Sequence, residues 1–268
     1  MTQSQTIAST SNTTTGVTGI VATSPANYLY AIDPTDNGVE AFSIGTNGTL
    51  SVISGSPFQL PSNILPGSLS ISGLAVSPSG SNLYALNGIN KFITGYRGVS
   101  GTGALTLMPS PFNTGTLTRP EQGIVDPSGQ YLYVSSNVIN VPGSSSGSLS
   151  GVLGYSIDAS TGNLTPLANS PFGMPSNGQP TQLAFDPTSH FLYVVLTSSS
   201  SIAGFVKDPM TGELTAMAGS PFLSESAANP QTVAIAVHPS GMFLYALNVS
   251  AKNLSAFTID STTGVLSP

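Results

Sequence analysis

Short apolar runs alternate along the chain with turns rich in Gly, Pro, Ser and Asn, and this pattern recurs five times. Each repeat starts with a run in which large and small side chains alternate, such as residues 232–237. A run with a Leu-Tyr pair follows, then a run with a central aromatic residue, and then a turn with Gly before Leu. Apolar runs of this length between turn residues are typical of β-strands. The Leu-Tyr pairs are Leu29-Tyr30, Leu83-Tyr84, Leu132-Tyr133, Leu192-Tyr193 and Leu244-Tyr245.

A repeat of about 50 residues built only from strand signals is typical of a β-propeller. We therefore predict an all-β, five-bladed β-propeller with four antiparallel strands per blade, in a single domain over residues 1–268. The first run of each repeat has two apolar faces, as expected of an innermost strand between neighbouring blades. The predicted repeats approximately cover residues 17–58, 71–112, 121–172, 181–222 and 232–268.

The last repeat ends where its outer strand should begin, whereas residues 2–8 precede the first repeat. We predict that residues 2–8 supply the missing outer strand of the last blade, which would remove an open sheet edge. The same pairing could instead join two chains, so self-association through strand exchange or blade faces remains an alternative.

Two turn motifs mark the ends of the predicted strands. The first and second strands are joined by type I turn chemistry, as in Asp126-Pro127-Ser128-Gly129. A Ser-Pro-Phe motif follows the fourth strand, where Pro suits an edge position because it cannot donate to a ladder. This motif begins at Ser56, Ser110, Ser170 and Ser220.

Charge is scarce, since only 6% of residues are charged and the formal net charge is −6. The five Lys and Arg residues are too few for a basic path along phosphates, which argues against nucleic acid as a partner. No apolar run approaches the ~20 residues of a membrane span, and the first residues lack the features of a signal peptide. There is no Cys. A surface of hydroxyls and amides favours a secreted or cell-surface protein.

The titratable residues that could carry chemistry fall mostly in repeated turns. His190 and His238 lie between first and second strands, on the face opposite the usual ligand site of a propeller, so we expect solvated turn residues. The repeated aspartates suit turn capping. Asp33 and Asp36 come nearest to a calcium cluster, but no complete ligand loop surrounds them. We predict no metal site and no cofactor.

A polar ring is predicted where the chain enters the first strand of each blade, because these entries surround the mouth of the central channel. Arg119 and Glu121 are its charged members. They could bind a neutral or carboxylated small molecule, with Arg119 pairing a carboxylate and Glu121 as base. The alternative is an internal ion pair with amides filling the channel. The predicted ligand-binding residues are Arg119, Glu121, Gln122, Gln179, Gln182, Asn229 and Gln231.

The combined turn, Leu-Tyr and Ser-Pro-Phe motifs resemble those of the lactonase-like β-propellers, a group that includes 6-phosphogluconolactonase, carboxymuconate-cyclising enzymes and the related YVTN-type propellers. The resemblance covers nearly the whole chain, from about Val17 to Pro268. It implies seven blades, although only five repeats are present here. It also implies an active site of His, Arg and Glu side chains around the channel, of which this ring offers Arg119 and Glu121.

Because charge is low and no histidine is placed to act as a base, we predict a non-catalytic extracellular binding or structural module that self-assembles. The alternative is a lactonase-like hydrolase or isomerase that acts on a small carboxylated or sugar lactone at the channel mouth. A small molecule or a glycan is the expected kind of ligand under either interpretation.

Overall fold

The regular structure of this protein consists of β-strands throughout the part that can be described. The computed structural model describes residues 18–23, 27–33, 38–61, 71–109, 111–115, 119–139, 149–174, 178–224 and 231–268. These residues form five antiparallel sheets, so the all-β prediction is confirmed. Among these described ranges we find no helix that is long and apolar enough to cross a membrane.

The strands follow the repeats of the sequence, and each sheet is a meander of consecutive strands. The first sheet contains β1 (Thr18–Ala22), β2 (Tyr28–Asp33), β3 (Gly38–Ile44), β4 (Leu50–Val52) and β5 (Phe58–Gln59). The second contains β6 (Ile71–Val76), β7 (Asn82–Asn87), β8 (Phe92–Gly98), β9 (Leu105–Leu107) and β10 (Phe112–Asn113). The third contains β11 (Pro120–Val125), β12 (Tyr131–Ile139), β13 (Leu149–Ile157), β14 (Leu164–Pro166) and β15 (Phe172–Gly173). The fourth contains β16 (Pro180–Phe185), β17 (Phe191–Leu196), β18 (Ser201–Lys207), β19 (Leu214–Ala216) and β20 (Phe222–Leu223). The fifth contains β21 (Thr232–Val237), β22 (Phe243–Asn248), β23 (Asn253–Ile259) and β24 (Leu266–Ser267).

The outer strand of the first four sheets is split into two short segments, which the sequence did not lead us to expect. In the fourth sheet, β19 and β20 both pair with β18. The Ser-Pro-Phe motif lies at the break, and the Ser side chain replaces the ladder bond that is lost there. Ser220 Oγ accepts the Gly204 N–H at 2.9 Å, and Ser170 Oγ accepts the Gly154 N–H at 2.9 Å. The motif therefore ends one outer segment and begins the next without leaving the inner strand unpaired.

A β-bulge interrupts the pairing of the first two strands in every sheet, close to the start of the first strand. The register shifts at residues 18–20, 71–73, 120–123, 180–183 and 232–234. A bulge adds one unpaired residue and redirects the side chains beside it. The bulges therefore recur at the same end of the first strand in each sheet.

Neighbouring sheets are joined by one repeated contact between the Leu-Tyr strand and the next Gly-Leu turn. Tyr30 donates its hydroxyl to the Gly103 carbonyl at 2.9 Å, and Tyr84 donates to Gly162 at 2.8 Å. Burial raises the pKa of Tyr30 to about 12, since ionisation would bury an unpaired charge. Tyr133 and Tyr193 make the same contact with Gly212 and Gly264. The repeated Tyr and Gly thus hold consecutive sheets together.

The hydrophobic core is divided among the four junctions between consecutive sheets. At the junction of the third and fourth sheets, Tyr133, Leu183 and Phe205 are all buried. The other three clusters lie between the first and second, the second and third, and the fourth and fifth sheets. Each sheet therefore packs on its sequence neighbours, as the two apolar faces of the inner strands predict.

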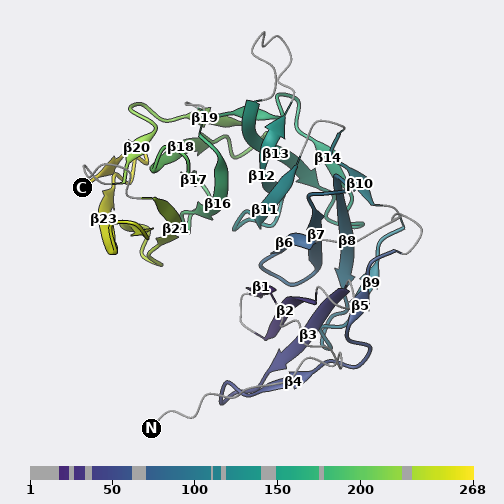
Figure 1. Cartoon of the computed structure of the whole chain (residues 1–268). Coiled ribbons are helices and arrows are strands. Elements are labelled where there is room, and N and C mark those ends of the chain that lie inside the picture. The colour runs from purple at the N-terminus through teal and green to yellow at the C-terminus, as the bar shows by residue number, and fades with distance from the viewer. Residues whose placement is uncertain are drawn as a thin grey trace.

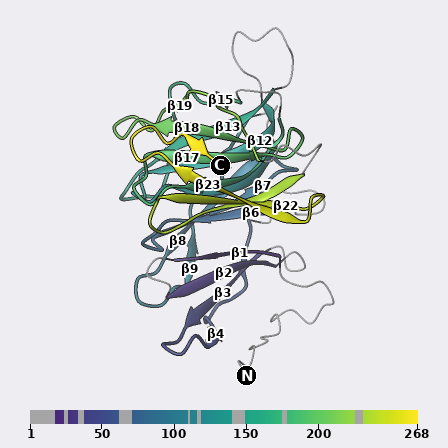
Figure 2. The same cartoon turned by 90° about the vertical axis from the view of Figure 1, so that its left-hand side faces the viewer.

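The described sheets form an open arc rather than a closed ring. Figure 1 shows the first sheet and the last sheet at the two ends of this arc, and Figure 2 shows the same arrangement from the side. One face of the last sheet is exposed, with Tyr245 at 41%, Leu247 at 42% and Leu254 at 68% exposure. The described strands thus support a propeller-like arrangement of sheets but do not confirm a complete five-bladed ring.

The last sheet differs from the prediction in one further respect. Its own C-terminal residues supply an outer segment, since β24 pairs with β23 through Thr258 and Ile259. This segment corresponds to β19 of the fourth sheet. The residues 2–8 that we expect to complete this blade lie outside the described residues.

Candidate functional site

Arg119 and Glu121 lie where the third sheet begins and form an ion pair at the start of its innermost strand. The distance from Arg119 Nε to Glu121 Oε1 is 3.1 Å, and the side chains are 63% and 27% exposed. Backbone contacts hold this segment, since the Arg119 N–H donates to Ser136 Oγ at 2.9 Å. The register shifts between Pro120 and Gly123, so this part of β11 does not follow the regular pairing with β12. The two charged residues therefore pair with each other, as the alternative of an internal ion pair describes, and both remain accessible to solvent.

Asn137 is a third member of this cluster and was missed by the sequence analysis. It lies in β12, opposite the start of β11, and its Nδ2 donates to Glu121 Oε1 at 3.2 Å. The Asn137 Oδ1 atom is buried and has no hydrogen-bond partner among the described residues. A buried acceptor without a partner is costly unless water or a ligand satisfies it. In the sequence, only its place in the same strand as the Leu132-Tyr133 pair could have pointed to Asn137.

The amide side chains of the predicted ring have separate roles. Gln182 is structural, because its Oε1 accepts the Ile235 N–H of the next sheet at 2.6 Å. Gln231 lies at the entry to β21, and its Oε1 accepts the Ser250 hydroxyl at 2.9 Å. The side chains of Gln122 and Gln179 are exposed. Asn229 lies outside the described residues. Gln182 therefore joins two sheets, whereas Gln122 and Gln179 are exposed to solvent.

Hydroxyl groups also tie the innermost strands together near the rim. Ser72 Oγ donates to the Pro120 carbonyl at 2.7 Å, and Ser135 Oγ donates to the Thr181 carbonyl at 2.8 Å. Each bond joins one sheet to the next. They hold the backbone on both sides of the Arg119–Glu121 pair against the neighbouring sheets.

A second ion pair, Lys207 with Asp126, is buried at the junction of the third and fourth sheets. The Nζ to Oδ2 distance is 2.7 Å, and the side chains are 3% and 0% exposed. Burial alone would raise the pKa of Asp126, but hydrogen bonds from Lys207, Ser128, Ser189 and a backbone amide keep it below its usual range. We expected Asp126 to be a turn cap only. It does accept the Tyr131 N–H at 2.9 Å, and it also holds the two sheets together.

The histidines lie where the sequence placed them, in exposed turns between first and second strands. His238 Nδ1 is 2.8 Å from Ser240 Oγ, and His190 Nδ1 is 2.9 Å from Thr188 Oγ1. Both are at the strand ends opposite Arg119, so neither can act on a molecule bound beside it. Within the described ranges, no three His, Cys, Asp or Glu side chains gather in a way that could hold a metal ion.

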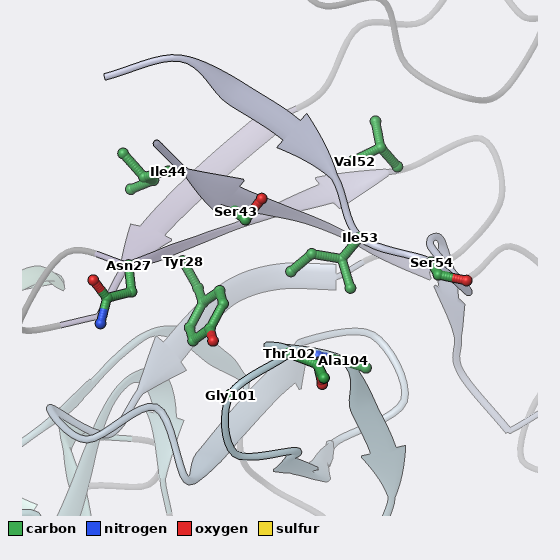
Figure 3. A pocket seen from close by; sticks show the side chains of 10 residues that line it. All are labelled: Asn27, Tyr28, Ser43, Ile44, Val52, Ile53, Ser54, Gly101, Thr102 and Ala104. Carbon is green, nitrogen blue, oxygen red and sulfur yellow. The ribbon is translucent and has the colours of Figure 1, made fainter. Parts of the chain in front are cut away.

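A groove with a volume of about 580 Å³ lies at the junction of the first and second sheets. Figure 3 shows Tyr28 and Ile53 directed toward the turn from Gly101 to Ala104. The groove opens at the strand ends opposite the Arg119–Glu121 pair. Its complete lining is Asn27, Tyr28, Ser43, Ile44, Val52, Ile53, Ser54, Gly101, Thr102 and Ala104.

Comparisons with known proteins relate this chain to lactonases. A family model described as "Lactonase, 7-bladed beta-propeller" matches residues 150–268. A comparison with curated proteins found no match. The predicted resemblance to the lactonase-like family is therefore confirmed by the family model for residues 150–268. Because that family is described as seven-bladed, the prediction of five blades is not confirmed.

Solved structures share the fold at low sequence identity. A protein of Bacteroides uniformis provisionally assigned as a 6-phosphogluconolactonase has a TM-score of 0.71 and 16% identity, over 93% of this chain and 69% of its own. The periplasmic gluconolactonase PpgL of Pseudomonas aeruginosa has a TM-score of 0.67 and 18% identity, over 94% and 68%. The hydrazine synthase of Kuenenia stuttgartiensis has a TM-score of 0.54 and 15% identity, over 92% and 84%. Because these proteins differ in their named activities, the likeness describes the fold.

The main functional prediction, a non-catalytic binding or structural module, is wrong. The lactonase family model and the 6-phosphogluconolactonase and gluconolactonase neighbours favour the alternative, a lactonase-like hydrolase. The prediction gave too much weight to the missing histidine base. A carboxylate such as Glu121 can serve as a base in its place.

Proposed function

We propose that this protein is a lactonase-like hydrolase that opens a small carboxylated or sugar lactone at the channel mouth. The observation that carries the proposal is the exposed Arg119–Glu121 pair, with Asn137 bonded to the same carboxylate oxygen. In a chain with five Lys and Arg residues, a guanidinium beside a carboxylate at the rim is a rare feature. The family match over residues 150–268 supports the reaction class.

Hydrolysis of a lactone requires a water to be deprotonated as it attacks the ring carbonyl. Glu121 would accept this proton, and the water oxygen would form a bond to the carbonyl carbon. The ring C–O bond then breaks, and the proton passes to the leaving alkoxide, so that one water is consumed for each hydroxy acid formed. Glu121 is 27% exposed, so a water molecule can reach it.

Arg119 would bind the negative charge of the substrate or of the intermediate. Its side chain is 63% exposed and uses Nε for Glu121, which leaves the terminal nitrogens of the guanidinium as further donors. A guanidinium can pair two oxygens of a carboxylate at once. Asn137 donates its Nδ2 to Glu121 Oε1 and would hold the base in place. A carboxylated lactone would offer its carboxylate to Arg119, whereas gluconolactone offers hydroxyl groups and no carboxylate.

The proposal is tested by lactone hydrolysis in a pH-stat, with δ-gluconolactone and a carboxylated γ-lactone as substrates. Glu121→Gln keeps the shape of the side chain but removes the base, so kcat should fall by about 100-fold or more. Arg119→Ala should raise KM most for the carboxylated lactone. Arg97→Ala is the control, because Arg97 bonds Asn82 at the opposite strand ends. Wild-type hydrolysis no faster than in buffer, or unchanged rates in Glu121→Gln, would refute the site.

The blade count and the closure of the last blade by residues 2–8 stand as part of this proposal. Five sequence repeats support the count. Deletion of residues 2–8 should lower the melting temperature if they complete that sheet. Light scattering of the wild type and of this variant distinguishes closure within one chain from exchange between chains. If the strand is exchanged, the wild type has the mass of an oligomer and the deletion lowers it. If closure occurs within one chain, the deletion leaves the number of chains per particle unchanged.

A secreted or cell-surface location also stands as a proposal. Its support is the composition, with 6% charged residues and a surface of hydroxyls and amides. Fractionation of the source cells, with the protein followed by antibody, would test it. Recovery only with the cytosol would contradict it.

A further inference from the structure

We propose that the groove between the first two sheets binds a neutral sugar, at a site separate from the channel mouth. The groove has a volume of about 580 Å³, within the range of about 300–1,000 Å³ that small-molecule sites occupy. Its lining contains no charged side chain. A charged ligand would lose its hydration there without gaining a partner, so the ligand should be neutral.

The floor of the groove is apolar and includes an aromatic ring. Ile53 is 7% exposed and Tyr28 lies beside it, with Val52 and Ala104 contributing further apolar surface. Figure 3 shows the Tyr28 ring between the first sheet and the turn of the second. The C–H face of a sugar ring is apolar and packs on such a ring, as other apolar groups do.

Uncommitted polar groups border this floor. The Tyr28 hydroxyl and the side chains of Asn27 and Ser54 make no hydrogen bond to any part of the chain that the structure describes. The equivalent tyrosine of the third sheet behaves differently, because Tyr131 donates its hydroxyl to the Met210 carbonyl at 2.8 Å. Two hydroxyls and one amide beside an apolar floor can pair the hydroxyls of a sugar.

The local sequence explains why this junction carries the groove. The turn that faces Tyr28 has Val99, Gly101 and Thr102 where the corresponding turn of the fourth sheet has Asp208, Met210 and Thr211. In the fourth sheet the Met210 carbonyl accepts the Tyr131 hydroxyl, so the tyrosine there is already paired with the turn. An Asp at the first position would also add a negative charge, which Val99 does not. The turn beside the groove therefore lacks the charge of its counterpart in the fourth sheet.

The test is a binding assay with a named panel of neutral sugars: cellobiose, lactose and N,N′-diacetylchitobiose, with sodium gluconate as the charged comparator. Saturation-transfer NMR followed by calorimetry should detect at least one neutral sugar and no gluconate at this groove. Tyr28→Phe should weaken binding by about tenfold, the loss of about 1.4 kcal/mol that one hydrogen bond supplies.

Ser54→Trp should abolish binding, because the indole would fill the groove from an exposed position. The matched control is Ala218→Trp, the equivalent exposed position of the fourth sheet, which should bind the sugar as the wild type does. Circular dichroism must show both Trp variants folded, and Tyr28→Phe supplies a readout if Ser54→Trp fails to fold. Absence of binding to every neutral sugar, or equal binding by Ser54→Trp and the wild type, would overturn the proposal. Lactone hydrolysis is measured separately at Arg119 and Glu121, so failure of one site does not bear on the other.

Discussion

The fourth and fifth sheets are built from nearly the same repeat, but they end up in different environments. Tyr193 of the fourth sheet is fully buried and bonds Gly264, whereas Tyr245 of the fifth is 41% exposed. β17 is buried along its whole length, and β22 alternates between buried and exposed residues. The difference shows that the environment of a blade depends on its next neighbour as well as on its own sequence.

The comparison extends to charge at the turn between the first and second strands. The third sheet has Asp126 at this position, where it is buried and paired with Lys207. The fifth has His238 at the corresponding position, where it is exposed. A polar side chain at this turn is buried where a following sheet covers it and exposed where the described sheets end.

The largest expected effect is at the buried pair. Lys207→Ala removes the partner of Asp126 and leaves a buried carboxylate without a counter-charge, so the free energy of unfolding should fall by about 3–5 kcal/mol. Urea unfolding followed by circular dichroism measures this change. Lys252→Ala, in an exposed turn of the last sheet, is the control and should have little effect. A loss below 1 kcal/mol for Lys207→Ala would mean that the pair is dispensable.

Removal of the tyrosine hydroxyl should affect the two sheets unequally. Tyr193→Phe leaves the buried Gly264 carbonyl without its donor, so the free energy of unfolding should fall by about 1 kcal/mol. Tyr245→Phe should change it by less than about 0.5 kcal/mol, because its side chain is exposed. The same urea titration compares the two. Equal losses would indicate that Tyr245 is covered in solution.

Acid should weaken the junction of the third and fourth sheets gradually. The pKa of Asp126 is lowered in the folded protein, so its stabilising contribution is present above its unfolded pKa and is lost as the pH falls through the lower folded value. Melting temperatures measured from pH 5 down to pH 2 should therefore fall. The fall should be shallower in Asp126→Asn. A parallel pH dependence in that variant would assign the effect to other carboxylates.

The smallest effect is expected on the exposed face of the last sheet. Leu254 is 68% exposed, so Leu254→Ser should change the free energy of unfolding by less than about 0.5 kcal/mol. The same substitution at Leu244, which is fully buried, provides the contrast and should cost several kcal/mol, about 3 or more. A large loss from Leu254→Ser would show that this face is buried by a partner in solution.

Much of the fold could be predicted because its signals are local. The strand starts at Ile71 and Thr232, and the Leu-Tyr strands, lie where the repeats placed them. The split outer strands could not be predicted, because the role of Ser170 depends on the Gly154 N–H of a different strand. Arg119 and Glu121 were singled out from their place at the entry to the first strand of the third repeat, and their ion pair was one of the two alternatives that this place left open.

Contacts that join distant parts of the chain escaped the sequence analysis. Asn137 reaches Glu121 only through the pairing of two strands, and Lys207 reaches Asp126 only through the packing of two sheets. The groove beside Tyr28 depends on a turn of the next sheet, so it too has no local signal.

The sequence by itself determined the repeat, the strands, the turns and the apolar faces of the inner strands, because each depends on residues that are close along the chain. Only the tertiary structure decided which Tyr is buried, which carboxylate is paired and where the sheets leave a groove. These outcomes depend on what lies against each sheet. The five repeats present similar surfaces. The sheets that pack against each repeat determine whether its surface is buried, lines a site or is exposed to solvent.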